Sequence, residues 1–128
     1  MLKKMDYVMV IVSDMNRSVE FYRDKLGIPL KFQSPDWTEF LTEGTTLALH
    51  GGGKAAQPTS GPPDQSAKAA TCSFGFNVAN VDQTYADLSS KGVHFVMPPM
   101  LREGEAIKLA VCTDPDGLPI SFAESLRK

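Results

Sequence analysis

The sequence predicts an α+β fold made of two tandem βαβββ modules. Two stretches, residues 7–27 and 73–92, repeat one plan: an apolar strand, a polar cap, an amphipathic helix and a closing glycine. Each stretch is followed by more strand-like sequence, which ends in LTEGTTLALH in the first half and in CTDPDGLPISFAE in the second. This internal duplication indicates two equivalent units, and the residues that face a cavity between or across such units should decide the function.

The first module, residues 1–50, begins with an apolar, valine-rich strand over residues 5–12. Asp14 can accept hydrogen bonds from the exposed amides of the next turn, which favours a helix start there. Gly27 can take the left-handed conformation that ends the helix. Apolar side chains at helical spacing form one face of this helix: Met15, Val19, Tyr22 and Leu26. Turns at 34–36 and 43–44 then separate three predicted strands: 28–33, 37–42 and 45–50.

The second module, residues 71–128, repeats this order with an alternating strand over 71–78 and a helix capped by Asn80 and closed by Gly92. Its remaining strands are predicted at 93–97, 106–113 and 119–123, with chain reversals at Pro98-Pro99 and Asp114–Gly117. Between the modules, residues 51–70 are dominated by glycine, proline, serine and alanine, which predicts a linker that could also fold over a site as a lid.

The composition of the 128 residues suits one domain over 1–128 and excludes several classes of function. The formal charge is -2 and no basic run is present, so we expect no nucleic-acid partner. The longest apolar stretch, 7–12, is far shorter than the roughly 20 residues that span a bilayer, and no signal peptide is evident. We therefore expect a cytoplasmic protein with no membrane partner. Cys72 and Cys112 both lie in apolar runs, where buried thiols are expected in place of a disulfide or a nucleophile.

Three segments carry a resemblance to a known family: VSDMNRSVEFYRDKLGI near the start, FNVANVDQTYADLSSKGV in the middle and DPDGLPISF near the end. With them the chain resembles the vicinal oxygen chelate superfamily, which includes glyoxalase I, bleomycin resistance proteins and extradiol dioxygenases. The resemblance covers nearly the whole chain apart from the linker. It implies that the two modules curl into an open, cup-shaped, mostly antiparallel sheet around a cavity, and that the protein is a homodimer.

The resemblance also implies where a divalent metal would be held, commonly by His or Gln on the first strand and Glu on the last strand of each module. This sequence places Tyr7 and Ala48 at those positions in the first module, and Ser73 and Ser121 in the second. A neutral serine hydroxyl is a poor anchor for a divalent ion and alanine offers no donor atom. We therefore expect no metal and no other cofactor.

A ligand-binding role is the alternative use of these positions. His50 lies two residues beyond Ala48, so in a regular strand it faces the same side; a solvated histidine is the competing interpretation. Trp37, the only tryptophan, could stack on a planar ligand or could pack in the core. Phe32, Phe40 and Phe122 could add lining, but the sequence leaves their strand phase open. The candidate ligand-binding set is Tyr7, Trp37, His50, Ser73 and Ser121.

Two other features are interpreted as structural. Asp114 and Asp116 stand around Pro115 and before Gly117, a spacing that a tight turn demands and that a catalytic acid–base pair does not need. His94 has no evident partner and is expected at the surface or at a sheet edge. No catalytic residue is assigned.

Three functions follow as hypotheses. The first is a metal-independent protein that binds a small apolar or aromatic molecule in the cup or in a dimer groove, as in the bleomycin resistance branch. The alternative is a metal-dependent lyase, isomerase or dioxygenase with a non-standard site such as Tyr7 and His50. A third is an accessory domain that serves mainly to dimerise. Metal content and ligand binding distinguish them.

Overall fold

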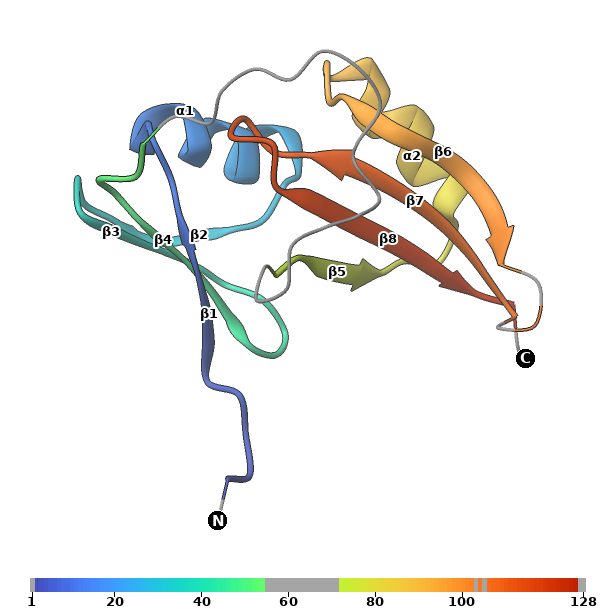
Figure 1. Ribbon diagram of the computed structural model, residues 1–128, viewed down its shortest axis with the longest axis horizontal. Coiled ribbons are helices and arrows are strands. Elements are labelled where there is room, and N and C mark those ends of the chain that lie inside the picture. Colours follow the sequence, from blue (N-terminus) through green and yellow to red (C-terminus); the bar gives the residue numbers. More distant parts are fainter. Residues whose placement is uncertain (1, 55–71, 103, 105, 127–128) are drawn as a thin grey trace. The chain divides into compact units, whose positions relative to one another are not determined.

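The computed structural model describes residues 2–54, 72–102, 104 and 106–126. The chain divides into a first unit, Met1–Ala56, and a second unit, Gln57–Lys128. Each unit has the element order strand, helix, strand, strand, strand, which can be followed along the colours of Figure 1. The prediction of an α+β fold with two βαβββ modules is confirmed. The bounds 1–50, 51–70 and 71–128 stay predictions.

The first unit contains a four-stranded mixed sheet in the order β1-β4-β3-β2. One neighbouring pair, β1 with β4, is parallel, and the other two pairs are antiparallel. This arrangement places the first and last strands of the module side by side, although more than thirty residues separate them in sequence. The strands are β1 (Tyr7–Ile11), β2 (Leu30–Gln33), β3 (Trp37–Phe40) and β4 (Thr46–His50).

The helix of the first unit begins as α1 (Met15–Val19) and continues as a π-helical segment, η1 (Glu20–Lys25). The predicted cap is confirmed, because Asp14 Oδ1 accepts a hydrogen bond from the Arg17 amide at 3.1 Å. In η1 each amide bonds five residues back, which widens the turn. Consecutive aromatic residues, Phe21 and Tyr22, are both buried there, and the Tyr22 ring lies 5.8 Å from the ring of Phe40 in the sheet.

The second unit repeats this topology with the order β5-β8-β7-β6 and a parallel β5–β8 pair. Asn80 caps its helix through a hydrogen bond from the Gln83 amide to Asn80 Oδ1 at 3.0 Å. Gly92 follows the helix with a φ of 86°, the left-handed conformation that the sequence predicts there. The elements are β5 (Phe74–Asn77), α2 (Val81–Ser90), β6 (Phe95–Arg102), β7 (Ile107–Thr113) and β8 (Pro119–Ser125).

The predicted chain reversal at Pro98-Pro99 is wrong, because β6 continues through both prolines. Proline cannot donate to a strand ladder, so within sheets it is restricted to edges and bulges. Both conditions are met: β6 is an edge strand, and its register with β7 shifts between Met97 and Met100. The edge position, which depends on the strand order, therefore allows a strand where the local sequence indicates a turn.

The two cysteines differ in their surroundings, and the prediction of two buried thiols is wrong for Cys72, which is exposed. Cys112 is fully buried in β7. Burial, together with the nearby carboxylate of Asp114, raises the pKa of the Cys112 thiol to about 12. Because the thiolate is the reactive form, Cys112 is protected from thiol reagents while the second unit is folded.

The reversal before β8 is confirmed as a turn organised by one aspartate. Asp114 is 4% exposed, and its Oδ1 accepts hydrogen bonds from the Asp116 amide at 2.9 Å and the Leu118 amide at 2.8 Å. The carboxylate thus closes the loop between β7 and β8 by pairing amides that the turn leaves without ladder partners.

The first residues of the predicted linker contact the first unit. The Gly51 amide donates to the Asp36 carbonyl at 3.0 Å, and the Gly53 amide donates to the Val12 carbonyl at 3.0 Å. A Cβ atom on Gly51 would lie 2.7 Å from the Pro35 carbonyl oxygen. Glycine therefore allows the chain after β4 to pass close to the β2–β3 turn. The rest of the linker, 55–70, lies outside the described residues.

None of the helices in the described ranges has the length and apolar character that a bilayer crossing requires. The cytoplasmic location stays a prediction.

Candidate functional site

The sheet of the first unit has one face covered by the helix and one open face. In β1 the residues alternate between half-buried and exposed, and Tyr7 and Ile11 are 54% and 59% exposed. The strand register then shows which residues of the neighbouring strands share this exposed face, because paired residues point to the same side of a sheet. We call this surface the open face; it consists of Tyr7, Met9, Ile11, Phe32, Trp37, Glu39, Thr46, Ala48 and His50.

Three of the five predicted ligand-binding residues meet on the open face. The ring centroids of Tyr7 and Trp37 are 5.8 Å apart at an interplanar angle of 78°, and those of Trp37 and His50 are 6.3 Å apart at 85°. Both are edge-to-face contacts, the arrangement that aromatic quadrupoles favour. The prediction that His50 shares a side with Ala48 is confirmed by the strand register.

The indole of Trp37 is held by a residue that the sequence analysis missed. Trp37 Nε1 donates to Glu39 Oε2 at 2.9 Å, and Glu39 Oε1 lies 3.7 Å from Lys31 Nζ. A partly buried indole N–H usually requires such an acceptor. The signal in the sequence was the two-residue spacing, since residues i and i+2 of a strand share a face. It could be used only once the strand itself was established.

Ala48 lies on the open face but has no exposed surface. On β1, Tyr7 lies level with the position two residues before Ala48 in β4. On β3, Trp37 lies level with the position two residues after Ala48. Because their ring centroids are only 5.8 Å apart, the two rings converge over the alanine methyl group. A small side chain at position 48 thus leaves the space that the aromatic rings fill.

Ser73 and Ser121, the other two predicted ligand-binding residues, belong to the second unit. Ser73 is exposed just before β5, and Ser121 is half-buried in β8, opposite Gly75 in the register. A Cβ atom on Gly75 would lie 3.2 Å from Ser121 Cβ, so the two strands leave little space beside the serine. Their role in ligand binding stays a prediction.

The other aromatic residues that could line a site lie on different faces of their sheets. Phe32 lies on the open face and is 45% exposed. Phe40 and Phe122 are buried on the opposite, helix-covered faces of their sheets, where Phe122 contacts Phe76 and Phe95. They are core residues. His94 is exposed, as predicted for a histidine without a binding role.

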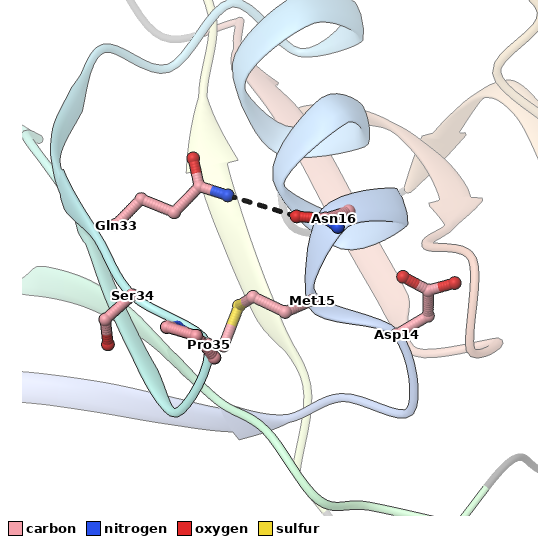
Figure 2. Close-up of a pocket in the computed structure, with 6 residues that line it drawn as sticks. All are labelled: Asp14, Met15, Asn16, Gln33, Ser34 and Pro35. Atoms are coloured by element: carbon pink, nitrogen blue, oxygen red, sulfur yellow. Dashed lines mark hydrogen bonds between the residues drawn. The ribbon is translucent and has the colours of Figure 1, made fainter.

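A separate hollow of about 400 Å³ lies on the other side of the first sheet (Figure 2). Gln33 pairs with Thr38, and the Thr38 hydroxyl donates a hydrogen bond to Met15 Sδ at 3.3 Å. Because Met15 belongs to the helix, the hollow lies on the helix-covered face of the sheet. One hydrogen bond, from Gln33 Nε2 to Asn16 Oδ1 at 3.4 Å, crosses it. None of the predicted site residues lines the hollow, which is formed by Asp14, Met15, Asn16, Gln33, Ser34 and Pro35.

Comparison with known proteins identifies the family. Residues 4–122 match the model of the Glyoxalase/Bleomycin resistance protein/Dioxygenase superfamily. The chain belongs to this superfamily. The resemblance seen in the three sequence segments is thereby confirmed for almost the whole chain.

Individual proteins are similar to this chain over most of their length. The protein YraH of Bacillus subtilis (strain 168) is 30% identical over 117 residues, which cover 88% of this chain and 91% of YraH. The crystal structure of SMU.1112c is 25% identical with a TM-score of 0.80, covering 97% of this chain and 100% of that one. The fosfomycin resistance protein FosX from Listeria monocytogenes has a TM-score of 0.74 over 98% of this chain and 95% of its own; at 16% identity it shows a shared fold.

The residues at the superfamily's metal positions do not fit a divalent ion. In the first unit the carboxylate position holds Ala48, which has no donor atom and lies beneath the rings of Tyr7 and Trp37. In the second unit the corresponding position is Ser121, whose neutral hydroxyl is a weak ligand for Mg²⁺, Mn²⁺ or Zn²⁺. Over the described ranges no group of three or more His, Cys, Asp or Glu side chains could hold a metal ion.

Proposed function

We propose that the protein binds a small planar aromatic molecule on the open face of its first unit, without a metal and without making or breaking a bond. The observation that carries this proposal is the Trp37 indole, which is oriented by Glu39 and flanked edge-on by Tyr7 and His50. A ring held in place before binding loses little conformational freedom when a ligand stacks on it, and this improves affinity.

Apolar neighbours support the same proposal. Met9, Ile11 and Phe32 expose large apolar side chains beside the aromatic group. Ligand sites in proteins are commonly lined by apolar and aromatic residues with a few polar atoms that fix orientation. Here Glu39 and His50 supply such atoms. We infer that sequestration of an aromatic antibiotic, as in bleomycin resistance proteins, is the kind of role this chemistry suits.

The first test uses Trp37 as both probe and target. Because the chain has a single tryptophan, its fluorescence reports on the proposed site alone. We expect planar aromatic antibiotics to quench this fluorescence and to raise the melting temperature in a thermal-shift screen. Replacing Trp37 with leucine should weaken binding about fivefold or more, measured by calorimetry, because stacking contributes about 1 kcal/mol beyond the buried area.

A matched control is Leu101→Ala, which removes an exposed apolar side chain from β6 of the second unit; it should leave affinity unchanged. The same screen includes divalent metals. A stoichiometric ion retained after purification and lost in Tyr7→Phe and His50→Phe variants would contradict the proposal and favour the metal-dependent enzyme.

We further propose that the protein is a homodimer. β1 is an edge strand of its sheet and is apolar along its length, Tyr7–Ile11. Unpaired edges with apolar side chains are commonly covered by another chain. Sedimentation equilibrium should give about twice the 13.9 kDa mass of the chain, and a monomer at micromolar concentration would refute this proposal.

A further inference from the structure

His50 has its ring orientation and its proton position set by the backbone. His50 Nδ1 lies 2.6 Å from the carbonyl oxygen of Gly51. A carbonyl oxygen only accepts hydrogen bonds, so Nδ1 must carry the proton in this contact. In the neutral imidazole the other nitrogen, Nε2, is then an unprotonated acceptor.

The carbonyl that imposes this tautomer belongs to the peptide between Gly51 and Gly52, and the peptides before and after it are hydrogen-bonded. The Gly51 amide donates to the Asp36 carbonyl at 3.0 Å, and the Gly51 Cα is so close to the β2–β3 turn that an added Cβ would lie 2.7 Å from the Pro35 oxygen. On the other side, the Gly53 amide donates to the Val12 carbonyl at 3.0 Å, so the Gly51 carbonyl lies between two hydrogen-bonded peptides. The acceptor character of Nε2 is a property of the folded unit.

Nε2 has no hydrogen-bond partner within the described part of the chain, and His50 is exposed on the open face beside Trp37. The nearby Glu39 carboxylate is also an acceptor, while the Trp37 N–H is already used by it. Lys31 Nζ, 3.7 Å from Glu39 Oε1, is drawn toward the same carboxylate. Lys31 Nζ can donate to a ligand, and the hydroxyls of Tyr7 and Thr46 can donate or accept, but His50 Nε2 can only accept from a ligand when the imidazole is neutral.

We infer that the aromatic molecule bound on the open face carries an N–H or O–H donor on its ring edge, which His50 Nε2 accepts. This inference rests on the proposed function and names its ligand class. A site built to accept a hydrogen bond discriminates against an analogue without the donor, because the acceptor is left unpaired. His50 is thus a specificity-determining residue, and Trp37 supplies the stacking that both kinds of ligand share.

The test compares two probes with one ring system: 2-naphthol, which has an O–H donor, and 2-methoxynaphthalene, which has none. Binding is followed by the indole N–H signal in a two-dimensional NMR spectrum, which is a single signal because Trp37 is the only tryptophan. We expect 2-naphthol to bind about tenfold more tightly than 2-methoxynaphthalene, the value of one neutral hydrogen bond. In His50→Phe, which keeps a ring and removes the acceptor, the ratio should fall to about one.

His94→Phe is the matched control, since it removes the other histidine, which is exposed in the second unit, and it should keep the tenfold ratio. Equal affinity of the two probes for the unmodified protein would overturn the inference while leaving the proposed function intact. If neither probe shifts the indole signal, the proposed function fails and the inference fails with it.

A second measurement needs no variant at the site. The nitrogen chemical shifts of the neutral imidazole distinguish the two tautomers, and His94→Phe leaves His50 as the only histidine in the spectrum. We expect the Nδ1-protonated form to predominate, with the Nε2 signal moving on addition of 2-naphthol. A predominantly Nε2-protonated ring would overturn the inference.

Discussion

Replacing Asp114 with alanine is expected to destabilise the second unit by about 3 kcal/mol. The carboxylate is buried, and its Oδ1 pairs two backbone amides, those of Asp116 and Leu118. A hydrogen bond to a charged group contributes about 1.5–3 kcal/mol, and an amide left buried without a partner adds a further penalty. The loop before β8 would lose the interactions that close it.

Cys112 provides the measurement, because it lies two residues before Asp114 and is buried with a pKa raised to about 12. In a Cys72→Ser background it reacts with a thiol reagent only when the second unit opens. Asp114→Ala should therefore accelerate labelling by about a hundredfold, the equivalent of about 3 kcal/mol.

Two comparisons make the result specific. Asp114→Asn removes the charge but keeps an oxygen acceptor, so it should accelerate labelling by about fivefold. Asp36→Ala removes an exposed aspartate from a turn in the first unit and should change nothing. A labelling rate for Asp114→Ala within threefold of the unmodified protein would show that the carboxylate does not organise the turn.

Replacing Gly51 with alanine is expected to cost about 2–3 kcal/mol in the first unit, as overpacking typically does. The new Cβ would lie 2.7 Å from the Pro35 carbonyl oxygen, and this is backbone that cannot move aside as a flexible side chain could. Separation of the two segments would also lengthen the hydrogen bond from the Gly51 amide to the Asp36 carbonyl. Urea unfolding followed by Trp37 fluorescence measures the effect in the same unit.

Gly44→Ala and Gly53→Ala complete the series. At Gly44 an added Cβ meets nothing within 4 Å, so alanine should be tolerated. At Gly53 it meets the end of the Ile11 side chain at 2.7 Å and the Val12 carbonyl oxygen at 3.1 Å, so an intermediate loss is expected. If Gly51→Ala and Gly44→Ala unfold at the same urea concentration, close packing after β4 is not the reason for glycine at position 51.

Much of the site could be anticipated from local sequence, and the part that could not depends on register. Tyr7, Trp37 and His50 were selected individually, and the structure brings their side chains together because β4 lies between β1 and β3. Glu39 was missed because its role appears only when its strand is known to share a face with Trp37. Phe40 and Phe122 were left open for the same reason, since a shift of one residue turns a strand side chain to the opposite face.

The sequence by itself determined the two modules, their helix caps at Asp14 and Asn80, the aspartate turn at Asp114 and the chemical identity of the residues at the superfamily's metal positions. These are local matters, decided by nearby backbone amides or by side-chain type alone. Only the tertiary structure decided that β6 passes through two prolines, that Cys72 is exposed while Cys112 is buried, and that Trp37 is held by Glu39 and flanked by Tyr7 and His50. Edge position, burial and cross-strand contacts all arise from pairing between distant segments, which no local pattern specifies.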